Sequence, residues 1–213
     1  MNASERVIVL AGGTSAAGVA VTRALVGVGA RVIATGRSAS GIAAVRNAGA
    51  EGHVADATSL ADMQRLAEES GAVDGVIPLV GGWRGGGGLA GQSDDDFAAL
   101  LPALEAVRAT SRAFDAHLQA SDAGRFAIVS STAVARPLAG GANYAAVKAA
   151  SEAWTRSVAH GFTKSARDAG EPLRAASVIF RAKALDPESL ATAIVGLWDH
   201  SAEELNDSII DLD

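Results

Sequence analysis

The fold is decided by residues 7–20, which read VIVLAGGTSAAGVA. A short β-branched run leads into a Gly-rich turn, and the turn leads into a segment of helical period. Such a turn places unpaired backbone N–H groups at the positive end of a helix dipole, and Gly12 with its small neighbours lets a pyrophosphate approach them. Purely structural turns also use Gly, but the strand, turn and helix together favour a dinucleotide site.

The rest of the chain repeats this alternation of short β-branched runs with longer Ala-rich segments, which is typical of βαβ units and a parallel sheet. The sequence predicts a single doubly wound α/β domain over 1–213, a Rossmann-type fold with a mostly parallel seven-stranded sheet and helices on both faces. The predicted strands are Arg6–Leu10, Arg31–Thr35, Gly52–Ala55, Gly75–Val80, Arg125–Ser130, Ala175–Phe180 and Ser208–Asp211. The predicted helices are 16–28, 40–48, 59–70, 94–120, 143–167 and 187–199, with Pro102 kinking or splitting the fourth.

The composition excludes several classes of function. The chain has 213 residues, of which 49% are apolar and 20% charged, as in an ordinary globular protein. A net charge of −6 argues against nucleic acid or an anionic membrane as a partner. There is no Cys, no apolar run long enough for a membrane span, and no metal-ligand spacing among the four His, so we expect a cytoplasmic protein without a metal site.

The end of the second predicted strand indicates which dinucleotide binds. Enzymes that prefer NAD place a carboxylate there to bind the ribose hydroxyls. No Asp or Glu occurs between Glu5 and Glu51, and the strand ends with Arg37 and Ser38, where a 2′-phosphate would lie. A single Arg is often only a solvated surface residue, but the missing acid favours NADP(H) over NAD(H) as the cofactor.

One helix carries a candidate acid/base pair. Tyr144 is the only Tyr of the chain, and Lys148 follows at i+4, so both side chains lie on one helix face. A nearby cation favours the phenolate and lowers the pKa of a phenol. Ser131 comes 13 positions earlier, just past the fifth strand, where its hydroxyl can polarise a carbonyl. The alternative is a half-buried core Tyr beside a surface amine.

These residues resemble the short-chain dehydrogenase/reductase family over nearly the whole chain. The resemblance implies that Tyr144 is the general acid/base, that Ser131 polarises the carbonyl, and that Lys148 binds the nicotinamide ribose. It also implies that Asp56 meets the adenine amino group. The expected cofactor contacts are Gly12, Thr14, Ser15, Ala17, Gly18, Arg37, Asp56, Ala57, Gly81, Gly82, Tyr144 and Lys148.

The chain departs from the family pattern at four places. Ala16 replaces the second Gly of the turn, and Pro78-Leu79-Val80-Gly81 replaces Asn-Asn-Ala-Gly after the fourth strand. No Asn lies between Ser93 and Arg112, where the family has a residue of its proton relay. Phe180-Arg181 replaces Pro-Gly after the sixth strand, and the usual substrate-covering segment is nearly absent. We therefore expect an open site.

The Gly-rich segment 81–91 follows the fourth strand, at the end where ligands bind in parallel sheets. Its Gly81-Gly82-Trp83 resembles the same place in dihydropteridine reductases, so Trp83 is a candidate for stacking on a flat substrate. Those enzymes lack the Ser present here as Ser131, and Trp83 can instead pack on a neighbouring helix. A plain flexible surface loop is the further alternative.

The sequence thus predicts an NADP(H)-dependent oxidoreductase that transfers hydride between nicotinamide and a carbonyl, alcohol or pterin-like small molecule. The alternative is a non-catalytic dinucleotide-binding sensor or regulatory protein, since several family residues are missing. The long helices before and after the fifth strand carry long, Ala-rich apolar faces that one chain cannot cover completely. In the family that the chain resembles, these helices pack against a partner subunit. We expect a homodimer or homotetramer.

Overall fold

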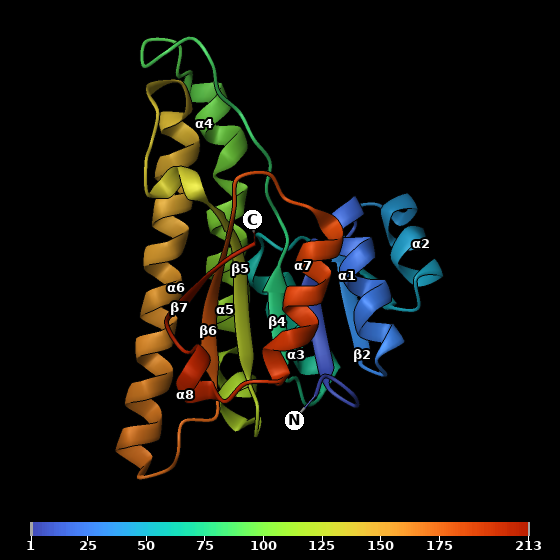
Figure 1. Ribbon diagram of the computed structural model, residues 1–213. Helices are drawn as coiled ribbons and strands as arrows, with labels where there is room; N and C mark the ends of the chain where they lie inside the picture. Colours follow the sequence, from blue (N-terminus) through green and yellow to red (C-terminus); the bar gives the residue numbers. More distant parts are fainter. Residues whose placement is uncertain (1, 213) are drawn as a thin grey trace.

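The computed structural model describes residues 2–212 and contains a seven-stranded sheet in which all neighbouring strands are parallel (Figure 1). The strand order is β3-β2-β1-β4-β5-β6-β7, so the chain winds outward in both directions from β1 and β4. This confirms the predicted doubly wound sheet. The strands are β1 (Val7–Ala11), β2 (Arg31–Gly36), β3 (Glu51–Val54), β4 (Gly75–Pro78), β5 (Arg125–Ser131), β6 (Ala176–Ala182) and β7 (Ser208–Asp211).

Helices cover both faces of the sheet, as predicted (Figure 1). They are α1 (Ala16–Gly27), α2 (Ala39–Asn47), α3 (Leu60–Ser70), α4 (Asp94–Leu100), α5 (Pro102–Ala120), α6 (Ala142–Ala169), α7 (Pro187–Val195) and α8 (Ala202–Leu205). Three short 3₁₀ segments are η1 (Thr132–Val134), η2 (Ala139–Gly141) and η3 (Gly196–Trp198).

Alternate residues of the strands belong to two separate hydrophobic cores, because successive side chains of a strand point to opposite faces of the sheet. Ile8 and Leu10 pack with α1, α2 and α7 on one face. Val9 and Ala11 pack with α3, α5 and α6 on the other. The sheet is therefore buried on both sides, which explains why its strands are nearly continuous apolar runs.

The predicted helix 94–120 is split at Pro102, which was one of the two predicted outcomes: α4 ends at Leu100 and Pro102 opens α5, where its missing N–H costs nothing. Other predicted boundaries were wrong. The strand predicted to reach Val80 stops at Pro78. The last long helix stops at Val195 and continues as a 3₁₀ turn. The short helix α8 was missed although Ser201 and Glu204 form a capping box there.

A buried Arg ties together the amino-terminal edge of the sheet. Arg125 at the start of β5 has no exposed surface. Its Nε donates to the carbonyl of Leu197 at 2.9 Å, and Nη2 donates to that of His200 at 2.8 Å. Nη1 donates to the carbonyls of Gly124 and Arg174 at 2.8 and 3.1 Å. Burial lowers the pKa of Arg125 to about 10, so it remains a cation at neutral pH.

The irregular segments lie at the opposite side of the sheet, where the carboxyl ends of the parallel strands are; we call this side the carboxyl edge. The connection from β4 to α4, the helix α4 and the first turns of α6 rise beyond this edge (Figure 1). Because the strands are parallel, the loops that follow β1, β4, β5 and β6 all emerge here. Within residues 2–212, no helix has the length and apolar character needed to cross a membrane.

Candidate active site

The turn between β1 and α1 is held by close backbone packing. A Cβ atom on Gly18 would overlap the carbonyl group of Gly13, so only Gly allows α1 to begin this close to the turn. Gly12 has φ +75°, and a Cβ atom there would lie 2.5 Å from Val80 Cγ2. Ser15 caps α1, because its Oγ accepts from the N–H of Gly18 at 3.2 Å. Gly18 is thus a packing residue in this fold.

The first turn of α1 offers an anion site. No hydrogen bond within residues 2–212 uses the N–H groups of Ala16 and Ala17. Acidic side chains are absent from this first turn. The unpaired N–H groups and the helix dipole can therefore act together on a phosphate.

The residues predicted to bind the adenosine part of the cofactor lie around the ends of β2 and β3. Arg37 is exposed directly after β2 and forms no ion pair with another described residue. The side chain of Thr14 lies against Gly36 and Gly41. Asp56 uses Oδ1 to accept from both the N–H and the hydroxyl of Thr58, each at 2.9 Å. Ala57 is buried in the core.

A cavity of about 1110 Å³ opens at the carboxyl edge, between the start of α1 and the start of α6. It brings together eight of the predicted site residues, namely Ser15, Ala17, Gly81, Gly82, Trp83, Ser131, Tyr144 and Lys148. The cavity lining does not include the other predicted cofactor contacts, which are Gly12, Thr14, Gly18, Arg37, Asp56 and Ala57. The predicted catalytic side chains therefore share one cavity with the start of α1.

Tyr144 and Lys148 lie one turn apart on α6. The Tyr144 ring is half-buried against the apolar cluster of Leu100, Ala103 and Val147. Lys148 Nζ lies 5.8 Å from the centre of that ring and donates to the carbonyl of Val129 at 2.7 Å. Both residues line the same cavity, as their i, i+4 spacing predicted.

The Lys148 ammonium is almost completely buried. The residue is 8% exposed, and burial lowers its pKa to about 8, while the nearby charge of Glu152 acts in the opposite direction. At neutral pH the amine is still mostly protonated. A cation is therefore present beside the phenol at neutral pH.

Ser131 ends β5 and is buried at the wall of the cavity. Its Oγ accepts from the N–H of Ala133 at 3.2 Å, which caps the 3₁₀ turn η1. Because that bond uses an oxygen lone pair, the hydroxyl proton remains available for a further acceptor. Ser131 can therefore donate to an oxygen in the cavity.

The sequence analysis missed a buried ionic network next to these residues. Glu152 Oε1 accepts from Ser130 Oγ at 2.7 Å and from Arg181 Nε at 2.9 Å, and Oε2 accepts from Arg181 Nη2 at 2.6 Å. Burial raises the pKa of Glu152, but the hydrogen bonds from Arg181 and Ser130 outweigh it and hold the pKa below its usual value. Glu152 lies four residues after Lys148, which was the signal in the sequence. The network joins α6 to β5 and β6.

A second missed residue, Gln92, holds the start of α6. Gly141 at the N-cap position gives no side-chain cap, and Gln92 Oε1 instead accepts from the N–H of Asn143 at 3.1 Å. Gln92 Nε2 donates to the carbonyls of Gly86, Gly88 and Gly140 at 3.0 to 3.2 Å. The Gly-rich segment is thus fastened to the helix that carries Tyr144. Sequence spacing gives no sign of this contact between distant segments.

The comparison with known proteins follows the same regions. The sequence profile of the short chain dehydrogenases matches residues 6–166, which is more than half of the chain and includes the turn after β1 as well as Ser131, Tyr144 and Lys148. The chain belongs to the short-chain dehydrogenase/reductase family. This oxidoreductase family uses nicotinamide cofactors.

Solved structures of this family share the fold over almost their whole length. A metagenomic short-chain oxidoreductase in complex with NADP is 24% identical, with a TM-score of 0.81 over 97% of this chain and 96% of that one. A short-chain dehydrogenase/reductase from Mycobacterium ulcerans is 16% identical, with a TM-score of 0.86 over 100% and 90%. Levodione reductase is 16% identical, with a TM-score of 0.84 over 99% and 96%. No curated protein matches the chain.

The buried amine generates a prediction about pH and stability. The pKa of Lys148 falls from 10.5 in an exposed chain to about 8 in the fold. The buried ammonium therefore destabilises the folded state below pH 8. This destabilisation decreases as the pH rises toward 10.5, because the folded state loses the proton before the unfolded state does. Relative to Lys148→Met, the parent should gain about 2 kcal/mol of unfolding free energy between pH 7 and pH 10. Urea denaturation at each pH measures the difference.

The matched control is Lys164→Met, which removes an exposed amine from the same helix. Its difference from the parent should change little over this range. Parallel pH curves for the parent and Lys148→Met would show that the amine keeps an ordinary pKa in the fold.

Proposed function

We propose that the protein is an NADP(H)-dependent reductase of carbonyl groups in small molecules, with Tyr144 as the general acid/base. The observation that supports this best is the shared cavity: it is lined by Ser131, Tyr144 and Lys148 and also by the start of α1. A protein that only sensed a dinucleotide would not need a phenol, a buried amine and a serine hydroxyl at one place.

The residues fit a nicotinamide dinucleotide. The unpaired N–H groups of Ala16 and Ala17 would hold the pyrophosphate, and the small residues of the preceding turn leave its approach clear. Lys148 and Gly81 would lie beside the nicotinamide ribose, while Asp56 has Oδ2 left for the adenine. When bound, the cofactor would supply the hydride.

The protein residues then handle the proton. The hydroxyl of Tyr144 would give its proton to the substrate oxygen as that oxygen becomes an alcohol. Ser131 would donate a hydrogen bond to the same oxygen and polarise the carbonyl. The ammonium of Lys148 would stabilise the phenolate that remains until a proton returns from solvent. In the reverse direction Tyr144 would act as the base.

The residues at the end of β2 support a preference for NADP(H). Arg37 is exposed there, and the first turn of α2 begins directly after it with Ser38 as its cap. A guanidinium and a helix N-terminus side by side favour a phosphate, and neither faces an acidic side chain in that turn. A ribose hydroxyl without its phosphate would leave Arg37 without this partner.

Trp83 supports a flat or aromatic substrate. The indole lines the cavity and is 63% exposed, so no neighbouring helix covers it. Aromatic faces of this kind stack on flat rings. A pterin-like compound therefore belongs in the substrate panel with aldehydes and ketones.

The most direct test replaces Tyr144 by Phe, which removes only the hydroxyl. Oxidation of NADPH should be followed with a panel of aldehydes, ketones and a quinonoid dihydropterin. On the best substrate of the parent, Tyr144→Phe should lose about 10² to 10⁴ in kcat because the proton donor is gone. The affinity for NADPH, measured by titration, should stay close to that of the parent. Equal rates in the two proteins would refute the proposed chemistry.

Cofactor preference has its own test. The parent should bind NADPH at least about tenfold more tightly than NADH, or about 1.4 kcal/mol, at fixed ionic strength. Arg37→Asp should reverse this order, since a carboxylate repels the phosphate and accepts from the ribose hydroxyls. Arg23→Asp, which makes the same charge change at an exposed position of α1, should keep the order of the parent. Equal affinities in the parent would remove Arg37 from the cofactor site.

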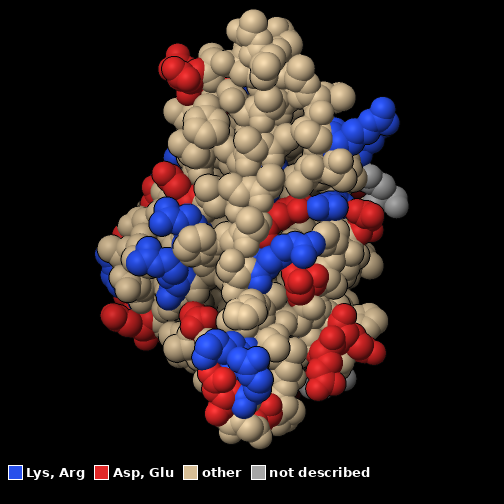
Figure 2. Space-filling view, turned by 90° about the vertical axis from the view of Figure 1, so that its left-hand side faces the viewer, with Lys and Arg blue, Asp and Glu red and all other residues tan. Residues whose placement is uncertain are grey.

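We also propose that the protein forms a homodimer or homotetramer through α6. The first half of this helix exposes a row of small side chains: Ala146, Ala149, Ala150 and Ala153. Figure 2 shows that the upper part of this side of the molecule carries few charged residues. Small apolar side chains let a second helix approach closely, so this face suits a second copy.

Light scattering should give a mass two or four times the 21.3 kDa of one chain. Ala149→Glu should lower the measured mass toward 21.3 kDa, because a carboxylate would be buried in the interface. A monomeric parent would contradict this proposal.

A further inference from the structure

The cavity at the carboxyl edge has an unusual charge balance. Its lining includes three basic side chains, those of Arg136, Lys148 and Lys183, and no Asp or Glu among the described residues. The chain as a whole has 24 acidic and 18 basic residues, so composition does not explain this bias. A cavity lined by one sign of charge attracts a ligand of the opposite sign.

Two of these basic residues, Arg136 and Lys183, are used neither by the turn between β1 and α1 nor by the proposed acid/base pair, and Arg136 is the one on the same wall as the proposed catalytic hydroxyls. It lies five positions after Ser131, in the connection between η1 and η2, and this connection leads on to Tyr144. Its side chain is exposed and forms no ion pair with any residue of the range 2–212. Arg136 therefore belongs to the wall that carries the proposed catalytic hydroxyls, with its charge uncompensated.

The same cavity has a large exposed apolar component. Trp83, Leu138 and Leu185 line it and are 63%, 72% and 41% exposed. They come from three separate connections, which follow β4, η1 and β6. Large apolar side chains that remain exposed around one cavity indicate a ligand surface.

We propose that the substrate is a carbonyl compound that also carries a carboxylate, which Arg136 binds, and an apolar portion, which packs against Trp83, Leu138 and Leu185. This inference rests on the proposed reductase function and specifies its substrate class. The planar guanidinium fork matches a carboxylate with two parallel hydrogen bonds. The apolar rim would hold the remainder of the molecule out of water. The open site left by the short segment after β6 then gains its specificity from Arg136.

The test compares one keto acid with its neutral ester. The probes are 5-oxo-5-phenylpentanoate and its methyl ester, which share the ketone and the ring and differ in the charge. Binding is measured by calorimetry in the presence of NADP⁺, so that no reduction takes place. The parent should bind the acid at least about fivefold more tightly than the ester. In Arg136→Gln this ratio should fall to about one, because the guanidinium is lost.

Arg23→Gln is the matched control, since it removes an exposed Arg from α1, away from the cavity lining. It should keep the ratio of the parent. Equal binding of acid and ester by the parent would overturn the inference, as would an equal loss of preference in the two variants.

Rates of NADPH oxidation with the same two probes separate the inference from the proposed function. Reduction of both probes at equal kcat/KM, with no effect of Arg136→Gln on their ratio, would leave a reductase that does not recognise carboxylates. Arg136-dependent binding of the acid without reduction of either probe would support carboxylate recognition and overturn the reductase proposal.

Discussion

The contact between Gly18 and the carbonyl group of Gly13 is the constraint on which the site depends. Because no side chain can stand between them, α1 begins directly on the turn that leaves β1. Ser15 then caps the helix, and the next two residues, whose N–H groups are unpaired, line the cavity. The same placement lets Val21 and Leu25 of α1 pack into the core on one side of the sheet. A single close approach thus fixes both an anion site and a helix.

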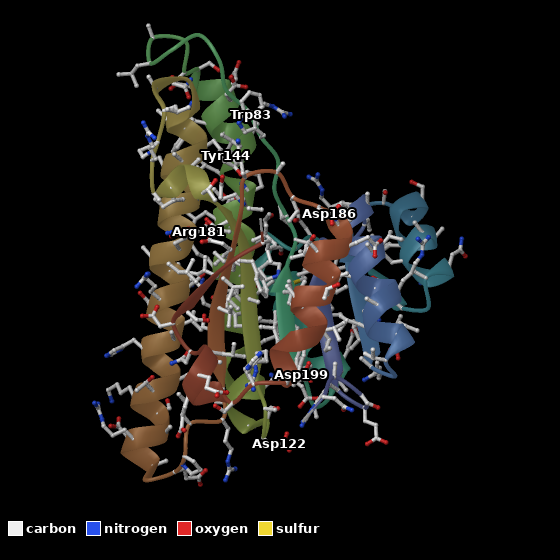
Figure 3. All side chains as sticks on the ribbon, in the orientation of Figure 1. Trp83, Asp122, Tyr144, Arg181, Asp186 and Asp199 are labelled. Carbon is white, nitrogen blue, oxygen red and sulfur yellow. The ribbon has the colours of Figure 1, made fainter. Side chains whose placement is uncertain are left out.

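The parallel sheet brings segments that are distant in the sequence close together in space. Segments that follow β1, β4, β5 and β6 are far apart along the chain, yet all end at one edge and line one cavity. The two edges are held by different chemistry. Arg125 ties the amino-terminal edge through backbone carbonyls, whereas the carboxylate of Glu152 ties β5, β6 and α6 near the carboxyl edge. Figure 3 shows Trp83 and Tyr144 at the carboxyl end and Asp122 and Asp199 at the other.

Local patterns predicted the parts of the molecule that depend on local physics. The strand, turn and helix at residues 7–20, the break at Pro102 and the shared face of Tyr144 and Lys148 follow from spacing and residue type. The pair of Glu152 and Arg181 does not, because it requires the register that sets Ser130 opposite Arg181. The cap that Gln92 gives to α6 requires a contact across about fifty residues. The spacing of Lys148 and Glu152 places both on one face of α6, but neither the partner of Glu152 nor the contact of Gln92 is visible in a periodic pattern.

The hydrogen bonds of Gln92 change how the Gly-rich segment 81–91 should be regarded. Gly86 is bonded to Gly140 through its N–H, and the carbonyls of Gly86 and Gly88 accept from Gln92. Residues 81–85 therefore connect the end of β4 to the fastened part, with Trp83 at their centre and Arg84 in an ion pair with Asp96. Ordering backbone costs roughly 1–2 kcal/mol per residue, so settling five residues loses far less conformational entropy than settling all eleven. The Trp83 indole can therefore close on a ligand with a small loss of conformational entropy, because the segment that must become ordered is short.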